Sequence, residues 1–334
     1  MKKIAVLGAG SWGTALALVL LRSRKEHSVC LWARRAEMAD TLAKKRVNTD
    51  YLDGFELPPE LEITSDLAQA VEEAEVVLGV VPSEHARVIY TNALPHLAPE
   101  ARIVSATKGL DFPALERMTQ MIAEVVGERF PARVAALSGP SFARETARGD
   151  PTAVVVASED EALATEIQEE MAGPTFRLYR TTDVTGVELG GAVKNVIAIA
   201  AGVCVGLGLG HNSTSALVTR GLAEVTRLGC ALGGRRETLF GLAGLGDLVL
   251  TCTGALSRNR SVGVALGQGR GLAEIQSSTR MVAEGVRTTA ATVELARRHG
   301  IEMPITQQMH AVLYEGRPPR DAIRELMERP LKTE

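Results

Sequence analysis

A glycine-rich turn near the N-terminus, Gly8-Ala9-Gly10-Ser11-Trp12-Gly13, constrains the fold of this chain more than any other feature. It directly follows a short aliphatic run at residues 3–7 and opens a helical pattern at residues 14–22. In such a strand–turn–helix unit, the first glycine permits a tight turn and the second lets the backbone approach a pyrophosphate. The third glycine lets helix and strand pack closely. The turn therefore predicts a dinucleotide-binding unit, with the pyrophosphate at the N-terminus of the helix.

The distribution of aliphatic runs predicts the architecture around this turn. Continuous runs that alternate with amphipathic stretches are typical of a parallel sheet covered on both faces. The expected strands are residues 3–7, 29–32, 76–81, 103–106 and 134–137, with two more at 151–158 and 176–182 at the end of the same sheet. Helices joined by glycine-rich turns are expected at residues 187–205, 213–232, 262–266, 281–299 and 305–315. We therefore expect an α/β Rossmann-type parallel-sheet domain over residues 1–186, followed by an all-α C-terminal domain over residues 187–334.

Charge and cysteine content exclude several classes of protein. The formal charge is −3, from 37 Lys and Arg against 40 Asp and Glu, which argues against binding to nucleic acid or to a charged membrane surface. Four cysteines are scattered without metal-ligand spacing, so we expect neither a metal site nor disulfides, and a cytoplasmic location. The apolar segment at residues 196–210 is shorter than the roughly 20 residues of a membrane span, so we expect a buried helix.

The residues after the second expected strand bear on cofactor choice. Sites that prefer NAD usually place a carboxylate there, about 20 residues past the glycine motif, to hold the ribose 2′-hydroxyl. Here the sequence reads Trp32-Ala33-Arg34-Arg35, and arginine suits a 2′-phosphate. This favours NADPH over NADH, although Arg34 and Arg35 could also be ordinary surface charges at the start of a helix.

Lys194 is the candidate catalytic group. It lies within the expected helix at residues 187–205, among small and apolar neighbours, although lysine is almost never fully buried unless paired. Gly190 and Gly191 would leave an open shelf beside its side chain. Burial favours the neutral form and brings a lysine pKa toward working pH, which suits a proton donor to a carbonyl oxygen. The alternative is a lysine that extends to solvent.

Other polar segments carry groups suited to a small anion. Lys108 and the Ser138-Gly139-Pro140-Ser141 segment follow expected strands, where parallel sheets bind ligands. A glycine-rich bend at residues 241–246 presents Asp247, and Ser257-Arg258-Asn259-Arg260 supplies donors for a phosphate. Together these groups predict a small phosphorylated substrate that bears a hydroxyl or a carbonyl.

With these motifs the sequence resembles the bacterial NAD(P)H-dependent glycerol-3-phosphate dehydrogenases along nearly its whole length. The resemblance rests on these blocks: GAGSWGTALA (8–17), ATKG (106–109), SGPSFA (138–143), ELGGAVKNVIAIAA (188–201), TRGLAE (219–224), GLAGLGDLVLTCT (241–253), SRNR (257–260), VAEG (282–285) and MPIT (303–306). His211 and Asp53 depart from the family pattern, which has Asn and Pro there.

The resemblance implies an activity and a set of site residues. The reaction would be reduction of dihydroxyacetone phosphate to sn-glycerol 3-phosphate for phospholipid synthesis, with Lys194 as general acid and, in the reverse direction, as base. The implied substrate contacts are Lys108, Gly139, Ser141, Lys194, Asp247, Ser257, Arg258 and Asn259. The implied cofactor contacts, beyond Gly8, Gly10 and Gly13, are Ser11, Trp12, Arg34, Arg35, Tyr51, Lys108, Ala143, Arg258, Val282 and Glu284.

Two other functions stay open at this point. A related dehydrogenase of a 3-hydroxy acid or sugar acid would need a carboxylate clamp in place of a phosphate clamp. A regulatory protein that senses nicotinamide cofactors would need neither Lys194 nor Asp247. The apolar helical half could also bury a homodimer interface.

Overall fold

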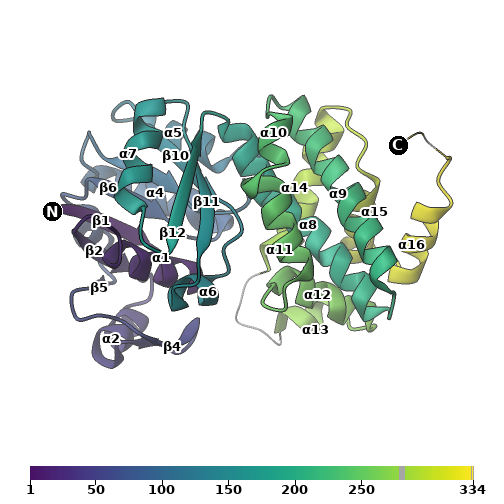
Figure 1. Cartoon of the computed structure of the whole chain (residues 1–334), viewed down its shortest axis with the longest axis horizontal. Coiled ribbons are helices and arrows are strands. Elements are labelled where there is room, and N and C mark those ends of the chain that lie inside the picture. Colours follow the sequence, from purple (N-terminus) through teal and green to yellow (C-terminus); the bar gives the residue numbers. More distant parts are fainter. Residues whose placement is uncertain (278–282, 332, 334) are drawn as a thin grey trace. The chain divides into compact units, whose positions relative to one another are not determined.

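Most strands of the first half assemble into one sheet in a computed structural model of the chain, which describes residues 1–277, 283–331 and 333 (Figure 1). Within these residues, eight strands pair in the order β12-β11-β10-β7-β6-β1-β2-β5. Their bounds are β1 (Lys2–Leu7), β2 (His27–Trp32), β5 (Glu62–Thr64), β6 (Val76–Gly79), β7 (Arg102–Ser105), β10 (Arg133–Ser138), β11 (Thr152–Ala157) and β12 (Phe176–Thr181). All seven expected strands are present, and β5 is an additional edge strand. The expectation of parallel pairing fails at one place: β11 runs antiparallel to β10, and β12 follows β11.

Helices cover both faces of this sheet because neighbouring side chains of each strand point in opposite directions. Ile4 and Val6 of β1 belong to one buried cluster, whereas Ala5 and Leu7 belong to another. The first cluster is completed by α1 (Ser11–Leu21), α2 (Ala36–Lys45), α6 (Ala143–Arg148) and α7 (Glu161–Met171). The second is completed by α3 (Leu67–Val71), α4 (Ser83–Ala93) and α5 (Met118–Gly127). A short 3-10 turn, η1 (Leu94–His96), follows α4.

The strand order reverses beside β1. From β1 the chain proceeds to β2 and β5 on one side, and then returns to β6, which pairs with the other side of β1. In open α/β sheets, ligands bind outside the carboxyl ends of the strands at such a reversal. Gly8 directly follows β1, so the glycine-rich turn occupies that position.

Two small hairpins extend the first half, and the sequence pattern did not predict either. One pairs β3 (Val47–Asn48) with β4 (Leu52–Glu56), and the other pairs β8 (Leu110–Asp111) with β9 (Glu116–Arg117). Their strands are too short and too polar to give an alternating signal.

The second half is helical, as expected. Its helices are α8 (Val184–Gly206), α9 (His211–Ala231), α10 (Arg236–Leu239), α11 (Asp247–Thr253), α12 (Arg258–Gly267), α13 (Leu272–Ser277), α14 (Glu284–Arg298), α15 (Pro304–Tyr314) and α16 (Pro319–Met327), with a π-helical turn η2 (Leu242–Gly246) before α11. The expected helix at 281–299 is seen from Glu284, and its first two expected residues lie outside the described residues. By its internal contacts the chain divides into two compact units, Met1–Glu188 and Leu189–Glu334.

Helix α8 is the most apolar element of the second half. By length and composition it could cross a membrane. Its 18-residue apolar stretch has a mean hydropathy of 1.7, but 89% of that stretch is buried inside the protein. The bent pair of Arg236–Thr253 and Arg258–Gly267 passes the same test if it is counted as one span. A helix that is apolar on all sides either crosses a membrane or lies in a protein core. The burial of α8 is typical of a core helix.

Glycines allow α8 and α12 to pack with their backbones in close contact. A Cβ on Gly202 of α8 would lie 2.1 Å from the Arg260 carbonyl oxygen, and one on Gly263 of α12 would lie 1.9 Å from the Ile199 oxygen. Gly206 and Gly267 repeat this relation one turn further along both helices. These four glycines therefore serve helix packing.

Candidate active site

The glycine-rich turn has the geometry that a pyrophosphate site requires. Gly8 has φ +119°, and a Cβ there would lie 2.6 Å from the Val80 carbonyl oxygen. A Cβ on Gly13 would lie 1.8 Å from the Gly8 oxygen, so this glycine permits the close approach of α1 to β1. Apart from its chain neighbours, no atom of the described residues lies within 4 Å of the Cβ position of Gly10, which leaves open space beside its backbone. Ser11 and Trp12 follow as the first residues of α1, where backbone N–H groups face an incoming anion.

The other predicted cofactor residues of the first unit lie around this turn with different exposure. Arg34 and Arg35 are exposed after β2, and Arg35 Nη2 lies 3.9 Å from an Asp50 carboxylate oxygen. Tyr51 is half-buried in the turn between β3 and β4, and its backbone N–H donates to the Asn48 side chain at 3.3 Å. Asn48 was not predicted from the sequence, since no motif marks it.

Three predicted substrate residues meet at the carboxyl end of β10. Gly139 has φ +143°, and a Cβ there would lie 2.9 Å from the Val154 backbone. Its carbonyl oxygen accepts hydrogen bonds from Lys108 Nζ at 3.1 Å and from Ser141 Oγ at 3.0 Å. Ala143 then begins α6. The structure thus brings Lys108, Gly139 and Ser141 together, at the edge of the sheet where the sequence placed them.

Lys194 lies on α8 and is only 4% exposed, so it does not extend to solvent. Its Nζ forms a buried ion pair with Asp247, which is 0% exposed, and donates to Thr251 Oγ1 at 2.8 Å. The Thr251 hydroxyl in turn donates to the Asp247 carbonyl oxygen at 2.6 Å. Asp247 and Thr251 stand four residues apart on α11, so both reach the same side of α8. Thr251 was missed in the sequence, although the block that carries Asp247 includes it.

The surroundings of Lys194 correct two expectations. The shelf expected beside Gly190 is filled, because a Cβ there would lie 2.8 Å from the Ala243 carbonyl oxygen. The expected glycine-rich bend is instead the π-helical turn η2, which continues directly into α11. A Cβ on Gly244 would lie 1.9 Å from the Leu239 oxygen, so this glycine is needed for packing. The glycines thus let backbone approach backbone and so close the site around the ion pair.

Cys252 is the neighbouring ionisable group on α11. Burial raises the pKa of its thiol to about 12, despite an opposing effect from the nearby Lys194 charge. The thiol is therefore neutral at physiological pH. Lys194 and Asp247 carry the charge at this place.

The first turn of α12 holds three more predicted residues. Ser257 caps the helix by accepting from the Arg260 N–H at 3.2 Å, and Arg258 is exposed at the first helical position. Asn259 is buried; it donates to Asn195 Oδ1 at 2.9 Å and accepts from the Gly285 N–H at 3.0 Å. This amide therefore joins α12 to α8, directly after Lys194, and to the start of α14. Glu284 is the first residue of α14, and Val282 lies outside the described residues.

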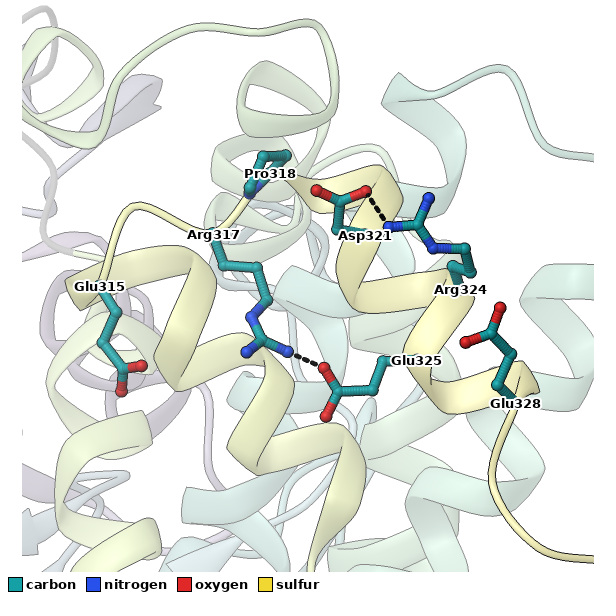
Figure 2. A pocket seen from close by; sticks show the side chains of 7 residues that line it. All are labelled: Glu315, Arg317, Pro318, Asp321, Arg324, Glu325 and Glu328. Carbon is teal, nitrogen blue, oxygen red and sulfur yellow. Dashed lines mark hydrogen bonds and ion pairs between the residues drawn. The ribbon is translucent and has the colours of Figure 1, made fainter.

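A separate pocket lies near the C-terminus and contains none of these residues (Figure 2). Arg324 pairs with Asp321 at 2.8 Å, and Arg317 pairs with Glu325. The lining is made of charged side chains and one proline: Glu315, Arg317, Pro318, Asp321, Arg324, Glu325 and Glu328. Its charges are in part paired with one another, as on an ordinary solvated surface. Across the described residues, no group of three or more His, Cys, Asp or Glu side chains could hold a metal ion.

Comparison with known proteins gives a consistent result over the whole chain. The family model for the NAD-dependent glycerol-3-phosphate dehydrogenase N-terminus matches residues 3–164, and the model for the C-terminus matches residues 183–324. The glycerol-3-phosphate dehydrogenase (NAD(P)+) of Koribacter versatilis is 58% identical over 335 residues, which cover 100% of this chain and 99% of the relative. The protein of the same name from Acidobacterium capsulatum is 54% identical over 339 residues and is covered completely. The crystal structure of glycerol-3-phosphate dehydrogenase from Coxiella burnetii superposes with a TM-score of 0.94 at 43% identity, covering 98% of this chain and 99% of that one.

Proposed function

Because the chain belongs to the NAD-dependent glycerol-3-phosphate dehydrogenase family, we propose that Lys194 performs the proton transfer of that reaction. The protein is an oxidoreductase that uses NAD(H) or NADP(H) to interconvert dihydroxyacetone phosphate and sn-glycerol 3-phosphate, a precursor of phospholipids. The observation that carries the residue assignment is the buried group of Lys194, Asp247 and Thr251.

The chemistry divides between cofactor and protein. The nicotinamide, when bound, supplies a hydride to the ketone carbon of the substrate. Lys194 donates a proton to the ketone oxygen as negative charge develops there, and takes it back in the oxidation direction. Asp247 balances the lysine charge, and the Thr251 hydroxyl accepts one of its N–H groups, so that Nζ is held in one orientation.

The phosphate of the substrate is assigned to the remaining polar residues. Arg258 can make charge-assisted hydrogen bonds, and the N-terminus of α12, capped by Ser257, favours negative charge. Asn259 holds α12 against α8, and among the described residues only one of its two amide hydrogens is bonded, so the other is available to a ligand. Lys108, Gly139 and Ser141 of the first unit are further proposed substrate contacts, and they supply a cation, a backbone turn and a hydroxyl.

The cofactor is assigned chiefly to the first unit. The pyrophosphate is assigned to the turn of Gly8, Gly10, Ser11 and Trp12, where Gly13 lets α1 approach β1. Tyr51 and Ala143 stand on other turns and are further proposed contacts. Arg258 and Glu284 are the contacts assigned in the helical unit. Arg34 and Arg35 are exposed cations suited to a 2′-phosphate, so NADPH is the preferred reductant.

The direct test follows NADPH absorbance with the purified protein and dihydroxyacetone phosphate. We expect turnover of this ketone and no turnover of a 2-keto acid or 3-keto acid of similar size. If the protein reduced a keto acid and left dihydroxyacetone phosphate untouched, the assignment of the phosphate-binding residues would be wrong.

Location and assembly complete the proposal. A cytoplasmic location is supported by the cysteines, because Cys30, Cys204, Cys230 and Cys252 are all free. A homodimer is supported by large apolar side chains exposed on the helical unit, among them Phe240 and Leu256. Light scattering would then give about twice the chain mass of 35.5 kDa, and cell fractionation would recover the activity with the cytoplasm.

A further inference from the structure

The side chain of Asn48 uses all of its hydrogen-bonding groups around the glycine-rich turn. It is 1% exposed, and its amide nitrogen donates to the Ala9 carbonyl oxygen at 3.0 Å and to Thr14 Oγ1 at 2.8 Å. Its amide oxygen accepts the Tyr51 N–H at 3.3 Å. One residue at the end of β3 therefore bonds the loop before α1, the first turn of α1 and the turn between β3 and β4.

The bond to Ala9 has a consequence for the next residue. A peptide unit is planar and trans, so the carbonyl of Ala9 and the N–H of Gly10 point in opposite directions. When Asn48 holds the carbonyl inward, the Gly10 N–H is turned outward. Apart from its chain neighbours, Gly10 also has no atom of the described residues within 4 Å of a Cβ position, so its open side is where a ligand can approach. Asn48 thereby fixes the direction of an amide that an anion would use.

The bond to Thr14 acts on the same turn from the other side. Thr14 is fully buried, and its N–H makes the first helical bond of α1, to the Gly10 carbonyl oxygen at 3.0 Å. Asn48 therefore restrains Ala9, which precedes Gly10, and Thr14, whose N–H bonds the Gly10 carbonyl oxygen. A loop that is preorganised in this way loses less entropy when it binds.

The hairpin that carries Asn48 is held at its other end as well. Arg144 donates to the Asp53 carbonyl oxygen at 3.2 Å, and its guanidinium carbon lies 5.5 Å from the centre of the Phe55 ring. Arg144 directly follows Ala143, another proposed cofactor contact. The hairpin at residues 47–56 thus connects two segments that are assigned to the cofactor.

We propose that Asn48 is a positioning residue for the dinucleotide: its side chain orients the Gly10 amide toward the pyrophosphate and fixes Tyr51 beside it. This inference rests on the proposed function, since it requires that the glycine-rich turn binds the cofactor. NADPH and NADH share the pyrophosphate, so Asn48 acts on both alike, whereas Arg34 acts through the 2′-phosphate that only NADPH carries.

The test measures the Kd of NADPH and of NADH by nicotinamide fluorescence, without substrate, in the Asn48→Ala variant. We expect both values to rise by about 3- to 10-fold, the scale of a lost buried hydrogen bond. At saturating NADPH, kcat should stay within about twofold of wild type, because the proton-transfer group is untouched. A split of this kind separates positioning of the cofactor from general loss of structure.

Arg46→Ala is the matched structural control. Arg46 bonds the base of the same hairpin, with Nη1 donating to the Leu61 carbonyl oxygen at 2.7 Å, and no bond joins it to the glycine-rich turn among the described residues. We expect this variant to lower Tm and to leave both Kd values unchanged. Thr14→Val, which removes one acceptor of Asn48, should raise both Kd values by a smaller factor and serves if Asn48→Ala does not fold.

Two results would overturn the inference. One is a wild-type Kd for both cofactors in Asn48→Ala, or in Thr14→Val if the first variant is unfolded. The other is an equal rise in Kd in Asn48→Ala and Arg46→Ala at equal loss of Tm. Because the binding measurement contains no substrate, it stays independent of the turnover test, in which failure to reduce dihydroxyacetone phosphate would overturn the proposed function itself.

Discussion

The charge of Lys194 is held in a place almost closed to solvent, where an unpaired ion is very costly. Asp247 compensates it, and breaking such a buried pair by removing one partner usually costs about 3–5 kcal/mol. The pair therefore serves both activity and stability, and the two effects must be separated by experiment.

Replacement of Lys194 by Ala tests the proton-transfer role. We expect kcat to fall by roughly 10²- to 10⁴-fold, the usual contribution of a positioned acid. The Kd of NADPH should change little, because the glycine-rich turn belongs to the other unit. A kcat near that of wild type would remove Lys194 from the mechanism.

Asp247→Asn tests the charge balance. This change leaves the lysine ammonium without its buried counter-ion, so we expect a loss of about 3–5 kcal/mol in the free energy of unfolding together with loss of activity. The double variant Lys194→Met/Asp247→Leu removes both charges and should regain most of that stability while remaining inactive. If the double variant were as unstable as Asp247→Asn, the unpaired charge would not be the cause.

Arg34→Ala tests cofactor preference. Removal of an exposed cation from the 2′-phosphate should raise KM for NADPH several-fold and leave KM for NADH nearly unchanged. Lys45→Ala is the control, because Lys45 is an exposed cation in the last turn of α2 and is not among the proposed cofactor contacts. An equal effect of Arg34→Ala on both cofactors would contradict the contact with the 2′-phosphate.

Among the elements, α8 and α12 depend on glycine for their close approach. Gly263→Ala would place a Cβ 1.9 Å from the Ile199 carbonyl oxygen, so one helix must move. We expect a loss of about 1–3 kcal/mol, as for other overpacked cores, measured by chemical unfolding. Gly271→Ala is the control, since its Cβ position has no neighbour within 4 Å in the part of the chain that the structure describes, apart from the adjoining residues. Similar losses in both variants would show that helix contact is not the cause.

The elements also show what the sequence could predict. The aliphatic runs of the sheet were predictable because a strand covered on both faces needs an unbroken apolar segment, as β1 and β6 have. The glycine-rich turn was predictable because a positive φ at Gly8 and the contact at Gly13 each require glycine.

Other features depend on contacts between residues far apart, which no local pattern encodes. Asn48 has its role through Ala9 and Thr14, over 30 positions away. The prediction of open space beside Gly190 was wrong because the backbone of η2 packs against this glycine. A glycine in a sequence shows that space is needed, but it does not show whether a ligand or another segment of the chain will occupy that space.

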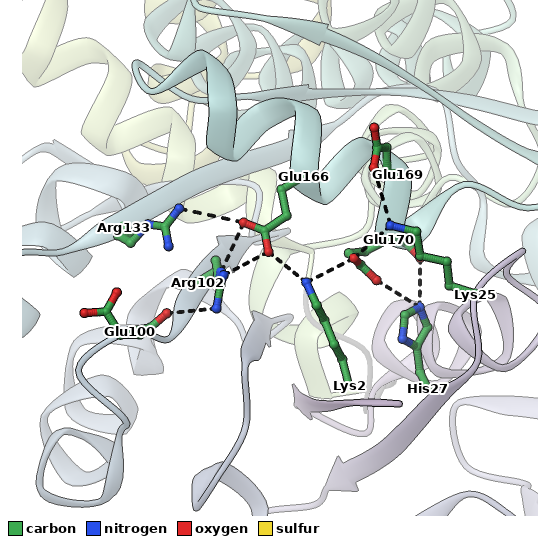
Figure 3. A network of polar contacts seen from close by, with 9 residues as sticks. All are labelled: Lys2, Lys25, His27, Glu100, Arg102, Arg133, Glu166, Glu169 and Glu170. Carbon is green, nitrogen blue, oxygen red and sulfur yellow. Dashed lines mark hydrogen bonds and ion pairs between the residues drawn. The ribbon is translucent and has the colours of Figure 1, made fainter.

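At the scale of the whole molecule, a charged network at the amino ends of the strands stabilises the first unit (Figure 3). Glu166 of α7 pairs with Lys2 of β1 at 2.8 Å and with Arg102 of β7 at 3.0 Å. Glu170 pairs with Lys2 and with Lys25, both at 3.0 Å. This edge is opposite to the one that carries the glycine-rich turn, so the network can be altered without touching the site.

The network makes stability depend on pH. Burial opposes ionisation of Glu170, but its bonds to Lys25 and Lys2 outweigh burial and hold the pKa of the carboxyl below its usual 4.5. The unfolded chain therefore binds the proton at higher pH than the folded chain does. The stabilisation is complete well above pH 4.5 and is lost as pH falls through the lowered pKa.

Glu170→Gln measures this contribution. We expect a lower Tm at pH 7 and a shallower fall of Tm on acidification below pH 4.5 than in wild type. Glu169→Gln is the control. The side chain of Glu169 is 62% exposed, and its 3.4 Å ion pair with Lys25 is longer than that of Glu170, so it contributes little to stability. An acid profile of Glu170→Gln that matched wild type would show that the network does not set the pH response.

Along the chain, the boundary between the two compact units falls within a helix and not within a loop. Helix α8 begins at Val184, where Asp183 accepts the Gly186 N–H at 2.8 Å, and continues past the boundary at Glu188 to Gly206. A chain cut at that boundary would lose backbone hydrogen bonds on both sides and expose aliphatic side chains. A chimera with a related protein should therefore keep α8 whole from one parent, with its junction before Val184.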